Sequence, residues 1–519
     1  MDLSFSSIPW TTIICLLVAL VVYRLFLKPW VLVFTYYRQG VPYFKRNPYK
    51  LNPSWMIHWQ DYIAPVYPKY FTSVVGPFSF LYLTDPALCK EVLQTKESSF
   101  VKSEFLIPLL REFLGNGLLF SNGEIWKSER RVINKAFRHE NLLKMSQLIE
   151  VACNSRIQKW KDMLNETEDH QMEVDWKAEM QELTVDVIGQ CAFGGNYSSV
   201  EFEGNSVKIT DLTQELEEEV MRYSQNFSYW ICPKKMELDL DQGTCDLRQK
   251  AKALRYVGKK IIRDRIDLLR KKVRSLEDSP DLLDLMLAVH LEDKDLAEAE
   301  KLVDLDLLVD ECATFILAGS ETTSTLLTWT FYNLTKHPEV LRKLRAELLE
   351  ELGENLKEDP KHLIKDFPAL DKLPYLSRVM LETLRLYPSA PLLSMKEAIE
   401  DVQLKGLSVK KGTNIMISPF IIHRSPFYWK DPKVFNPDRP GLDETDGRFL
   451  AFSTGKRSCI GQFFARMEAK IAIAKFAFAM DIKCDIETPI NLEYKITLYM
   501  KQPLPARLSQ WNPPSNLSQ

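Results

Sequence analysis

The stretch from 452 to 461, FSTGKRSCIG, places one cysteine, Cys459, between two glycines and directly after a basic pair. The residues that follow repeat apolar side chains at helical spacing, so we predict a buried helix with Cys459 in its first turn. Free backbone N–H groups at a helix start favour a thiolate there. Gly455 permits a turn closed to other residues, and Gly461 leaves room for a flat ligand. Without a second cysteine or histidine at ligand spacing, such a thiolate suits one axial bond to a haem iron.

A lone cysteine near a helix start is most often a small buried hydrophobic residue, and this alternative stands if Cys459 is taken alone. The haem interpretation depends on five positions taken together, namely Phe452, Gly455, Arg457, Cys459 and Gly461. This pattern resembles the haem-binding loop of the cytochromes P450, which are haem-thiolate monooxygenases. The rest of the chain must agree with that resemblance.

Composition excludes several other classes of protein. The chain has 519 residues, a net charge of −3 and 45% hydrophobic residues, which is typical of a globular protein and not of a nucleic-acid binder. Its nine cysteines lack zinc or disulfide spacing and indicate a reducing compartment. The seven histidines are equally dispersed, so no histidine cluster competes for a metal.

Ile8–Leu27 is the only long apolar segment, and about twenty residues suffice to span a bilayer. Arg24 and Lys28 lie at its C-terminal end, which by the positive-inside rule places the main body in the cytosol. The basic start and small-residue cleavage site of a signal peptide are missing. We therefore expect residues 1–30 to form a single-pass anchor and residues 31–519 one catalytic domain. The resemblance to microsomal members of the family implies the endoplasmic reticulum membrane.

Two strand-like runs around a Gly-Pro turn predict a β-hairpin over residues 70–83. Asp85-Pro86 then supplies an N-cap and a first helical residue. From there the pattern is mostly helical to about residue 390. The resemblance implies a mainly α fold with small β-sheets (α+β), in one large domain.

A helix opening at Gly123 carries Trp126 and Arg130 on one face, four residues apart. An indole N–H and a guanidinium so placed can both donate to one carboxylate, such as a haem propionate. The alternative is a surface arginine beside a core tryptophan. The family carries the same pair, so the resemblance assigns both to haem. Four basic residues on this helix and just after it face either an acidic partner or solvent: Lys127, Arg131, Lys135 and Arg138.

Leu302–Leu334 is the longest helical pattern, and His337-Pro338 ends it. Gly319 lies inside it and costs about 1 kcal/mol relative to alanine. A kink at Gly319 would open a groove for oxygen, with Thr322 freeing its hydroxyl and Glu321 relaying protons. Alternatively, Gly319 serves helix packing and Thr322 bonds back to its own helix. The spacing resembles the acid–threonine pair of the family.

Glu382 and Arg385 form an i, i+3 pair with apolar flanking residues, so we predict that the pair is buried. The segment Phe435–Arg439 resembles the family's source of a third partner, Arg439. We expect this group to stabilise the fold and to take no part in the chemistry.

Pro388–Asp401 is predicted to be a strand that approaches the haem. The family usually has an arginine here for the second propionate, whereas this chain has Lys396, which neutralises charge but cannot form a forked contact. His423 is a further candidate propionate contact.

The resemblance therefore implies a haem b (iron-protoporphyrin IX) monooxygenase that acts on a small lipophilic substrate at a membrane. No flavin or nicotinamide module is legible in the sequence, so electrons would come from NADPH through a separate NADPH–cytochrome P450 reductase, with cytochrome b5 as a second donor. Two alternatives are an oxygen-independent haem-thiolate isomerase or dehydratase and a non-catalytic haem sensor. Neither needs Glu321 and Thr322, and product formation that requires both oxygen and reductase would exclude both.

Overall fold

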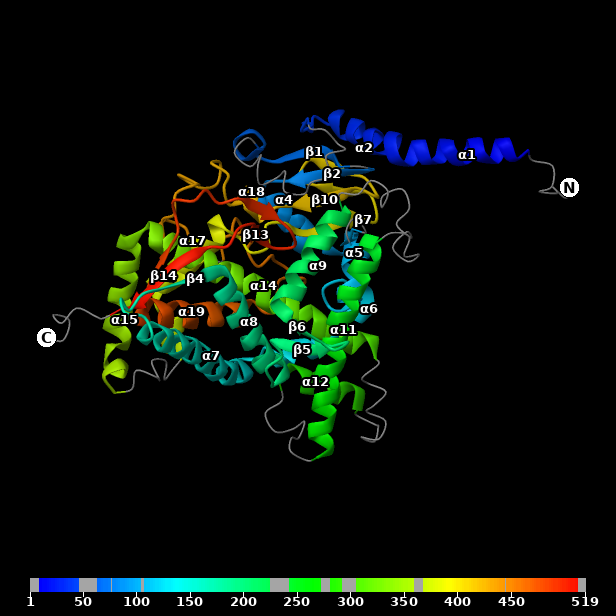
Figure 1. The fold of residues 1–519 in the computed structure, drawn as a ribbon. Helices are drawn as coiled ribbons and strands as arrows, with labels where there is room; N and C mark the ends of the chain where they lie inside the picture. Colours follow the sequence, from blue (N-terminus) through cyan, green and yellow to red (C-terminus); the bar gives the residue numbers. More distant parts are fainter. Residues whose placement is uncertain are drawn as a thin grey trace.

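The computed structural model describes residues 9–45, 63–75, 77–103, 107–224, 242–271, 281–291, 305–358, 367–443 and 445–511. The helices surround a long central helix, and the largest sheet lies at one side of the body (Figure 1). The prediction of a mainly helical fold with small sheets is confirmed.

The predicted hairpin is confirmed as β1 (Tyr70–Val75) and β2 (Phe78–Leu83), with Tyr70 opposite Leu83. Both strands are buried along most of their length, which is why they read as apolar runs. They belong to a five-stranded sheet of order β1-β2-β10-β7-β3, whose other members are β10 (Asn414–Ile417), β7 (Leu393–Ala398) and β3 (Phe100–Lys102).

Four smaller sheets complete the β structure. The first contains β11 (Met480–Cys484), β14 (Pro505–Gln510) and β4 (Met172–Asp175), in that order. The other three are two-stranded pairs: β5 (Ser199–Phe202) with β6 (Asn205–Lys208), β8 (Val402–Leu404) with β9 (Leu407–Val409), and β12 (Leu492–Tyr494) with β13 (Leu498–Met500).

The helices of the body follow one another with short connections. In the first half they are α4 (Pro86–Lys90), η3 (Glu91–Thr95), η4 (Glu97–Ser99), α5 (Ile107–Leu114), α6 (Gly123–Ala136), α7 (His139–Asn165), α8 (Trp176–Phe193) and α9 (Ile209–Ser224). In the second half they are α11 (Gln242–Arg270), α12 (Leu282–Leu291), α14 (Asp306–Lys336), α15 (Pro338–Glu358), α16 (Phe367–Asp371), α17 (Pro374–Leu386), α18 (Pro419–Ile422) and α19 (Gln462–Ala479). Asp85 caps α4 as predicted, because its side chain accepts from the Ala87 N–H.

The central helix α14 is buried along most of its length and ends before His337, as predicted. It continues without a break through Gly319, so the expected kink and groove are not found there. A Cβ at Gly319 would lie 2.7 Å from Cδ1 of Ile188 on α8. Close packing of α8 against α14 therefore explains this glycine, in agreement with the packing alternative.

The N-terminal segment is helical from Trp10 and extends away from the body (Figure 1). It comprises α1 (Trp10–Val22), a π-helical turn η2 (Tyr23–Leu27) and α2 (Lys28–Tyr37). No residue of α1 is buried, and its large apolar side chains are exposed. Across the ranges that the structure describes, no helix is both long enough and apolar enough to cross a membrane.

Candidate haem-binding site

The cysteine loop is closed by its own backbone. The Cys459 N–H donates to Phe452 O at 3.0 Å, and the Ser458 N–H donates to Gly455 O at 3.0 Å. Because α19 begins at Gln462 with Gly461 as its N-cap, Cys459 precedes the helix, and the prediction that it lies in the first turn is wrong. The Cys459 N–H closes the loop and so is not one of the free N–H groups of the helix start.

The two glycines of this loop have different roles. Gly455 has φ +81°, and a Cβ at this position would collide with the carbonyl oxygen of Leu93. No L-residue with a side chain fits there without strain. A Cβ on Gly461, by contrast, would meet no protein atom within 4 Å. This second position is compatible with a flat ligand lying against the backbone, as the sequence suggested.

The Cys459 side chain is accessible, but the surrounding protein displaces enough water to raise its pKa. A hydrogen bond from the Gly461 backbone lowers this pKa, as do the charges of Arg130 and Arg466. Arg466 also lies over the Phe452 ring, 4.9 Å from its centroid, which places a cation on the aromatic side chain that opens the loop. The loop therefore favours the thiolate through these donors and charges.

Arg457 brings the cysteine loop and α6 together. Its guanidinium lies 3.8 Å from the centroid of the Trp126 ring, and its Nη1 donates to Ser121 O at 2.9 Å. Burial lowers the pKa of Arg457 to about 10, and the nearby Arg130 contributes in the same direction. Arg130 is partly buried, and burial lowers its pKa as well. Trp126, Arg130 and Arg457, predicted from separate motifs, thus lie close to Cys459.

The largest sheet adds two lysines to this group. In the antiparallel pair β3–β7, Lys102 lies directly opposite Lys396, an arrangement that destabilises a sheet when both are charged. Burial lowers the pKa of Lys396 to about 8, and Arg457 lowers it further. The pKa of Lys102 lies well below its usual value because of burial and the charges of Arg457, Lys396 and Arg111. Sequence reasoning missed Lys102, because only the strand register places it opposite Lys396.

We call Lys102, Arg130, Lys396 and Arg457 the cationic cluster. Among the described residues, Glu97 is the acidic side chain whose charge acts on Arg457 and Lys396. A ligand that carries two carboxylates would relieve the mutual repulsion of these buried cations. The cluster and the cysteine loop therefore fit a haem, whose propionates would be held by the cluster.

His423 is fully buried beside the start of the cysteine loop. Its Nε2 accepts from the Leu450 N–H at 2.8 Å, and its ring stacks on Phe449 with centroids 5.3 Å apart. Burial and the nearby charge of Arg385 lower its pKa to about 3, so the ring is neutral. These contacts support the backbone that leads into the loop. A contact between His423 and a propionate stays a prediction.

Glu321 and Thr322 have different surroundings on α14. Thr322 Oγ1 donates to Ala318 O at 2.8 Å, so its hydroxyl bonds back to its own helix and is not freed as expected. Glu321 is buried and accepts hydrogen bonds from Thr213 Oγ1 at 3.2 Å and Gln181 Nε2 at 3.5 Å. Burial raises the Glu321 pKa, so this carboxyl group holds a proton more readily than an exposed glutamate.

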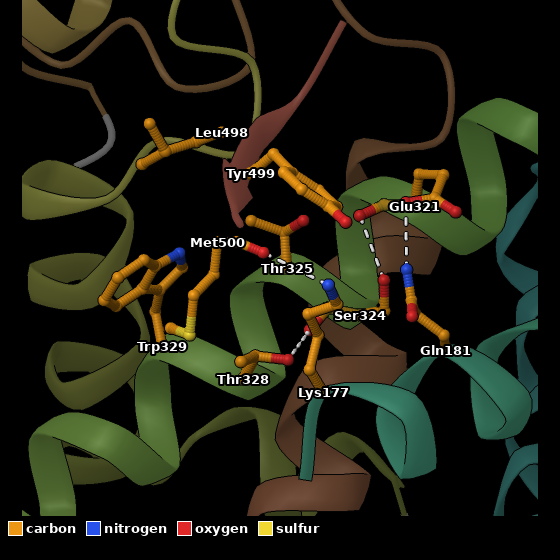
Figure 2. A pocket seen from close by; sticks show the side chains of 10 residues that line it. All are labelled: Lys177, Gln181, Glu321, Ser324, Thr325, Thr328, Trp329, Leu498, Tyr499 and Met500. Atoms are coloured by element: carbon orange, nitrogen blue, oxygen red, sulfur yellow. Dashed lines mark hydrogen bonds between the residues drawn. The ribbon is translucent and has the colours of Figure 1, made fainter. Parts of the chain in front are cut away.

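Glu321 also lines a small polar pocket between α8, α14 and β13 (Figure 2). Lys177 enters this pocket from α8 and donates to Met500 O at 3.1 Å. Its ammonium group lies 4.1 Å from the centroid of the Tyr499 ring. The acid of the predicted pair therefore faces polar groups on α8 and β13.

The predicted charged group on α17 is confirmed. Arg385 donates to Glu382 at 2.7 and 2.9 Å, and Arg439 Nε donates to Glu382 Oε1 at 3.2 Å. All three side chains are buried. None of their contacts involves the cysteine loop or the cationic cluster, which agrees with a structural role.

The comparison with known families decides what this site belongs to. The family model described as cytochrome P450 matches residues 47–508.

The chain belongs to the cytochrome P450 family. Three relatives illustrate its breadth. Cytochrome P450 4X1 of Rattus norvegicus is 30% identical over 83% of this chain and 82% of its own. Cytokinin hydroxylase of Arabidopsis thaliana is 34% identical over 80% and 77%. The chloroplastic carotene epsilon-monooxygenase of the same plant is 27% identical over 87% and 81%. Membership makes this P450 an oxidoreductase with a haem cofactor and supports haem-thiolate monooxygenase activity.

Proposed function

We propose that this P450 is a membrane-attached monooxygenase that inserts one oxygen atom from O₂ into a small lipophilic molecule. NADPH supplies two electrons, and the second oxygen atom leaves as water. The observation that carries the proposal is the cationic cluster beside the cysteine loop. Haem b combines a planar apolar ring with two carboxylates and matches both features.

Each predicted haem contact has a role that follows from its chemistry. Cys459 Sγ would be the axial ligand of the iron, and Phe452, Gly455 and Gly461 shape the loop that presents it. When bound, the haem supplies oxygen activation, and thiolate ligation favours O–O cleavage. Trp126 and His423 offer ring N–H groups to the propionates.

The cationic cluster would divide between the two propionates. Arg130 and Arg457 offer guanidinium donors near α6, where bidentate contacts with a carboxylate are available. Lys396 and Lys102 offer point charges from the sheet and cannot form such a fork. Binding of the carboxylates would keep both lysines charged, since an anion nearby favours the protonated form.

Glu321 and Thr322 would deliver protons. The buried Glu321 carboxyl group holds a proton and exchanges it with the polar pocket of Figure 2. Thr322 Oγ1 would give up its bond to Ala318 O and pass the proton to the haem side of α14. An apolar substrate pocket would exclude the water that diverts the oxidant.

The proposed partners follow from the chemistry that the chain lacks. Electrons would come from NADPH–cytochrome P450 reductase, with cytochrome b5 as a second donor. Residues 1–30 would attach the catalytic domain, 31–519, to the endoplasmic reticulum membrane from the cytosolic side. The fully exposed apolar side chains of α1 support this attachment. A relative named for its action on carotene supports a lipophilic substrate.

The function is tested by reconstituting the holoenzyme with reductase in lipid and screening lipophilic compounds. A substrate is first found as a shift in the haem spectrum. Its oxygenated product should then appear only when NADPH, reductase and oxygen are all present. A product formed without oxygen or reductase would refute the proposal and establish the isomerase alternative.

Thr322→Ala tests the proton relay in the same assay. We expect the haem, its thiolate spectrum and substrate affinity to persist, while electrons are diverted to hydrogen peroxide and product per NADPH falls several-fold. Proton-transfer groups typically contribute about 10²–10⁴-fold to rates. Thr330→Ala is the control, because Thr330 makes the same bond to the carbonyl four residues before it, at 2.8 Å, further along α14. Equal coupling in the two variants would remove Thr322 from the mechanism.

A further inference from the structure

Two glutamates on different helices face one another beside residues 115–122, which join α5 to α6. Glu311 of α14 is 2% exposed, and Glu129 of α6 is partly buried. Their carboxyl groups hydrogen-bond to each other. Glu129 Oε1 and Glu311 Oε2 have no further partner within the described ranges. Because an ionised carboxylate only accepts, this bond requires one of the two groups to keep its proton.

The remaining oxygens of the pair hold the 115–122 segment. The Leu118 N–H donates to Glu311 Oε1 at 2.6 Å, and Ser121 Oγ donates to Glu129 Oε2 at 3.2 Å. The segment has no regular secondary structure of its own. Its position therefore depends on these bonds to α14 and α6.

The same segment contacts the cysteine loop on its other side. Arg457 donates to Ser121 O at 2.9 Å and to Asn122 Oδ1 at 3.3 Å. Arg457 is a member of the cationic cluster and lies two residues before Cys459. The glutamate pair is thus connected to the haem site through the 115–122 segment and one arginine.

The surrounding charges favour a protonated pair. Burial and the charges of Glu129 and Asp310 raise the Glu311 pKa well above its usual value. Burial also raises the Glu129 pKa, and Asp310 adds to this shift. Asp310 accepts from the Asn116 N–H at 2.8 Å and is paired with Arg255 of α11, which also contacts Asp306. Arg255 is thus bound to two aspartates, and neither glutamate has a direct cationic partner among its described contacts.

We propose that Glu129 and Glu311 share one proton and form a clasp that positions the 115–122 segment and, through Arg457, the loop that holds the haem. The clasp concerns positioning and not oxygen chemistry, and it rests on the proposed function only for the identity of the ligand at the loop. A carboxyl group with a raised pKa stabilises the closed form fully below its ordinary value of about 4.3. This stabilisation is lost as the pH rises toward the raised value.

Amide hydrogen exchange of the holoenzyme, measured on peptides covering 115–122 from about pH 5 to about pH 9, tests the clasp. Intrinsic exchange cancels when wild type and Glu311→Gln are compared at equal pH. The glutamine keeps the acceptor for Leu118 and donates an N–H to Glu129, but does not titrate. The ratio of wild-type to variant exchange should rise by about tenfold per pH unit until the raised pKa is passed. Haem release to an acceptor protein should show the same trend.

Glu129→Gln is the second variant and should flatten the pH dependence in the same way, because its amide donates to an ionised Glu311. Glu124→Gln, at an exposed position in the first turn of α6, is the control and should follow the wild type. If wild type, Glu311→Gln and Glu129→Gln show the same pH dependence, no proton is shared and the proposal is overturned. The reduced carbon-monoxide spectrum, recorded on each sample, separately tests the haem-thiolate assignment.

Discussion

Arg385→Ala is expected to destabilise the fold strongly without any direct effect on the chemistry. Arg385 and Glu382 are both 0% exposed in their side chains. Arg385 makes two bonds to Glu382 and three to the backbone oxygens of His423, Pro432 and Val434, at 2.7, 2.8 and 3.2 Å. The alanine variant leaves the carboxylate with fewer donors and three carbonyls without this partner.

The expected loss follows from these contacts. Removing one partner of a buried ion pair costs about 3–5 kcal/mol because the other charge stays buried. Arg439 and the Asn436 N–H still donate to Glu382 at 3.2 and 3.0 Å, which prevents a larger loss from the carboxylate. Proteins have only about 5–15 kcal/mol of net stability, so this substitution should remove a third or more of it. Arg385→Lys keeps the charge but not the forked contact, and we expect an intermediate loss.

Arg378→Ala is the matched control on the same helix. Arg378 contacts Asp438 at 3.3 Å, but these side chains are 49% and 47% exposed. Exposed pairs contribute about 0–1 kcal/mol. The assay is the urea midpoint of unfolding, followed by circular dichroism, together with the yield of haem-loaded protein. Equal midpoints for Arg385→Ala and Arg378→Ala would refute the reasoning, as would a stable, haem-replete Arg385→Ala protein with altered turnover.

Three further predictions concern the haem site. Cys459→Ser should lose the thiolate signature in the reduced carbon-monoxide spectrum, and an unchanged spectrum would exclude Cys459 as the ligand. Lys396→Met should release haem faster below about pH 8, where Lys396 is charged, and should approach wild type above it; a pH-independent effect would contradict the charge contact. Charge reversal at Arg131 and Lys135, both exposed, should slow reduction by the reductase at low salt only, whereas Lys127 is already paired with Glu124; equal rates at every ionic strength would indicate a solvated face.

Local sequence patterns determined much of this protein. The hairpin, the central helix and the cap at Asp85 follow from periodicity and turn residues, which act within a few positions. The Glu382–Arg385 contact follows from i, i+3 spacing on an apolar helix face. The family resemblance at the cysteine loop then supplied the partner Arg439 and the cofactor, because its glycines, arginine and cysteine rarely occur at this spacing by chance.

Tertiary structure decided the features that depend on segments distant in the chain. Lys102 lies opposite Lys396 only because β3 pairs with β7 in one register, and no pattern near residue 102 indicates it. Gly319 is explained by Ile188 on another helix, 131 positions earlier in the chain. The contact between Glu129 and Glu311 requires α6 and α14 to approach one another. Burial and long-range contacts set the charge states of such groups, and a sequence pattern carries no measure of either until the chain has folded.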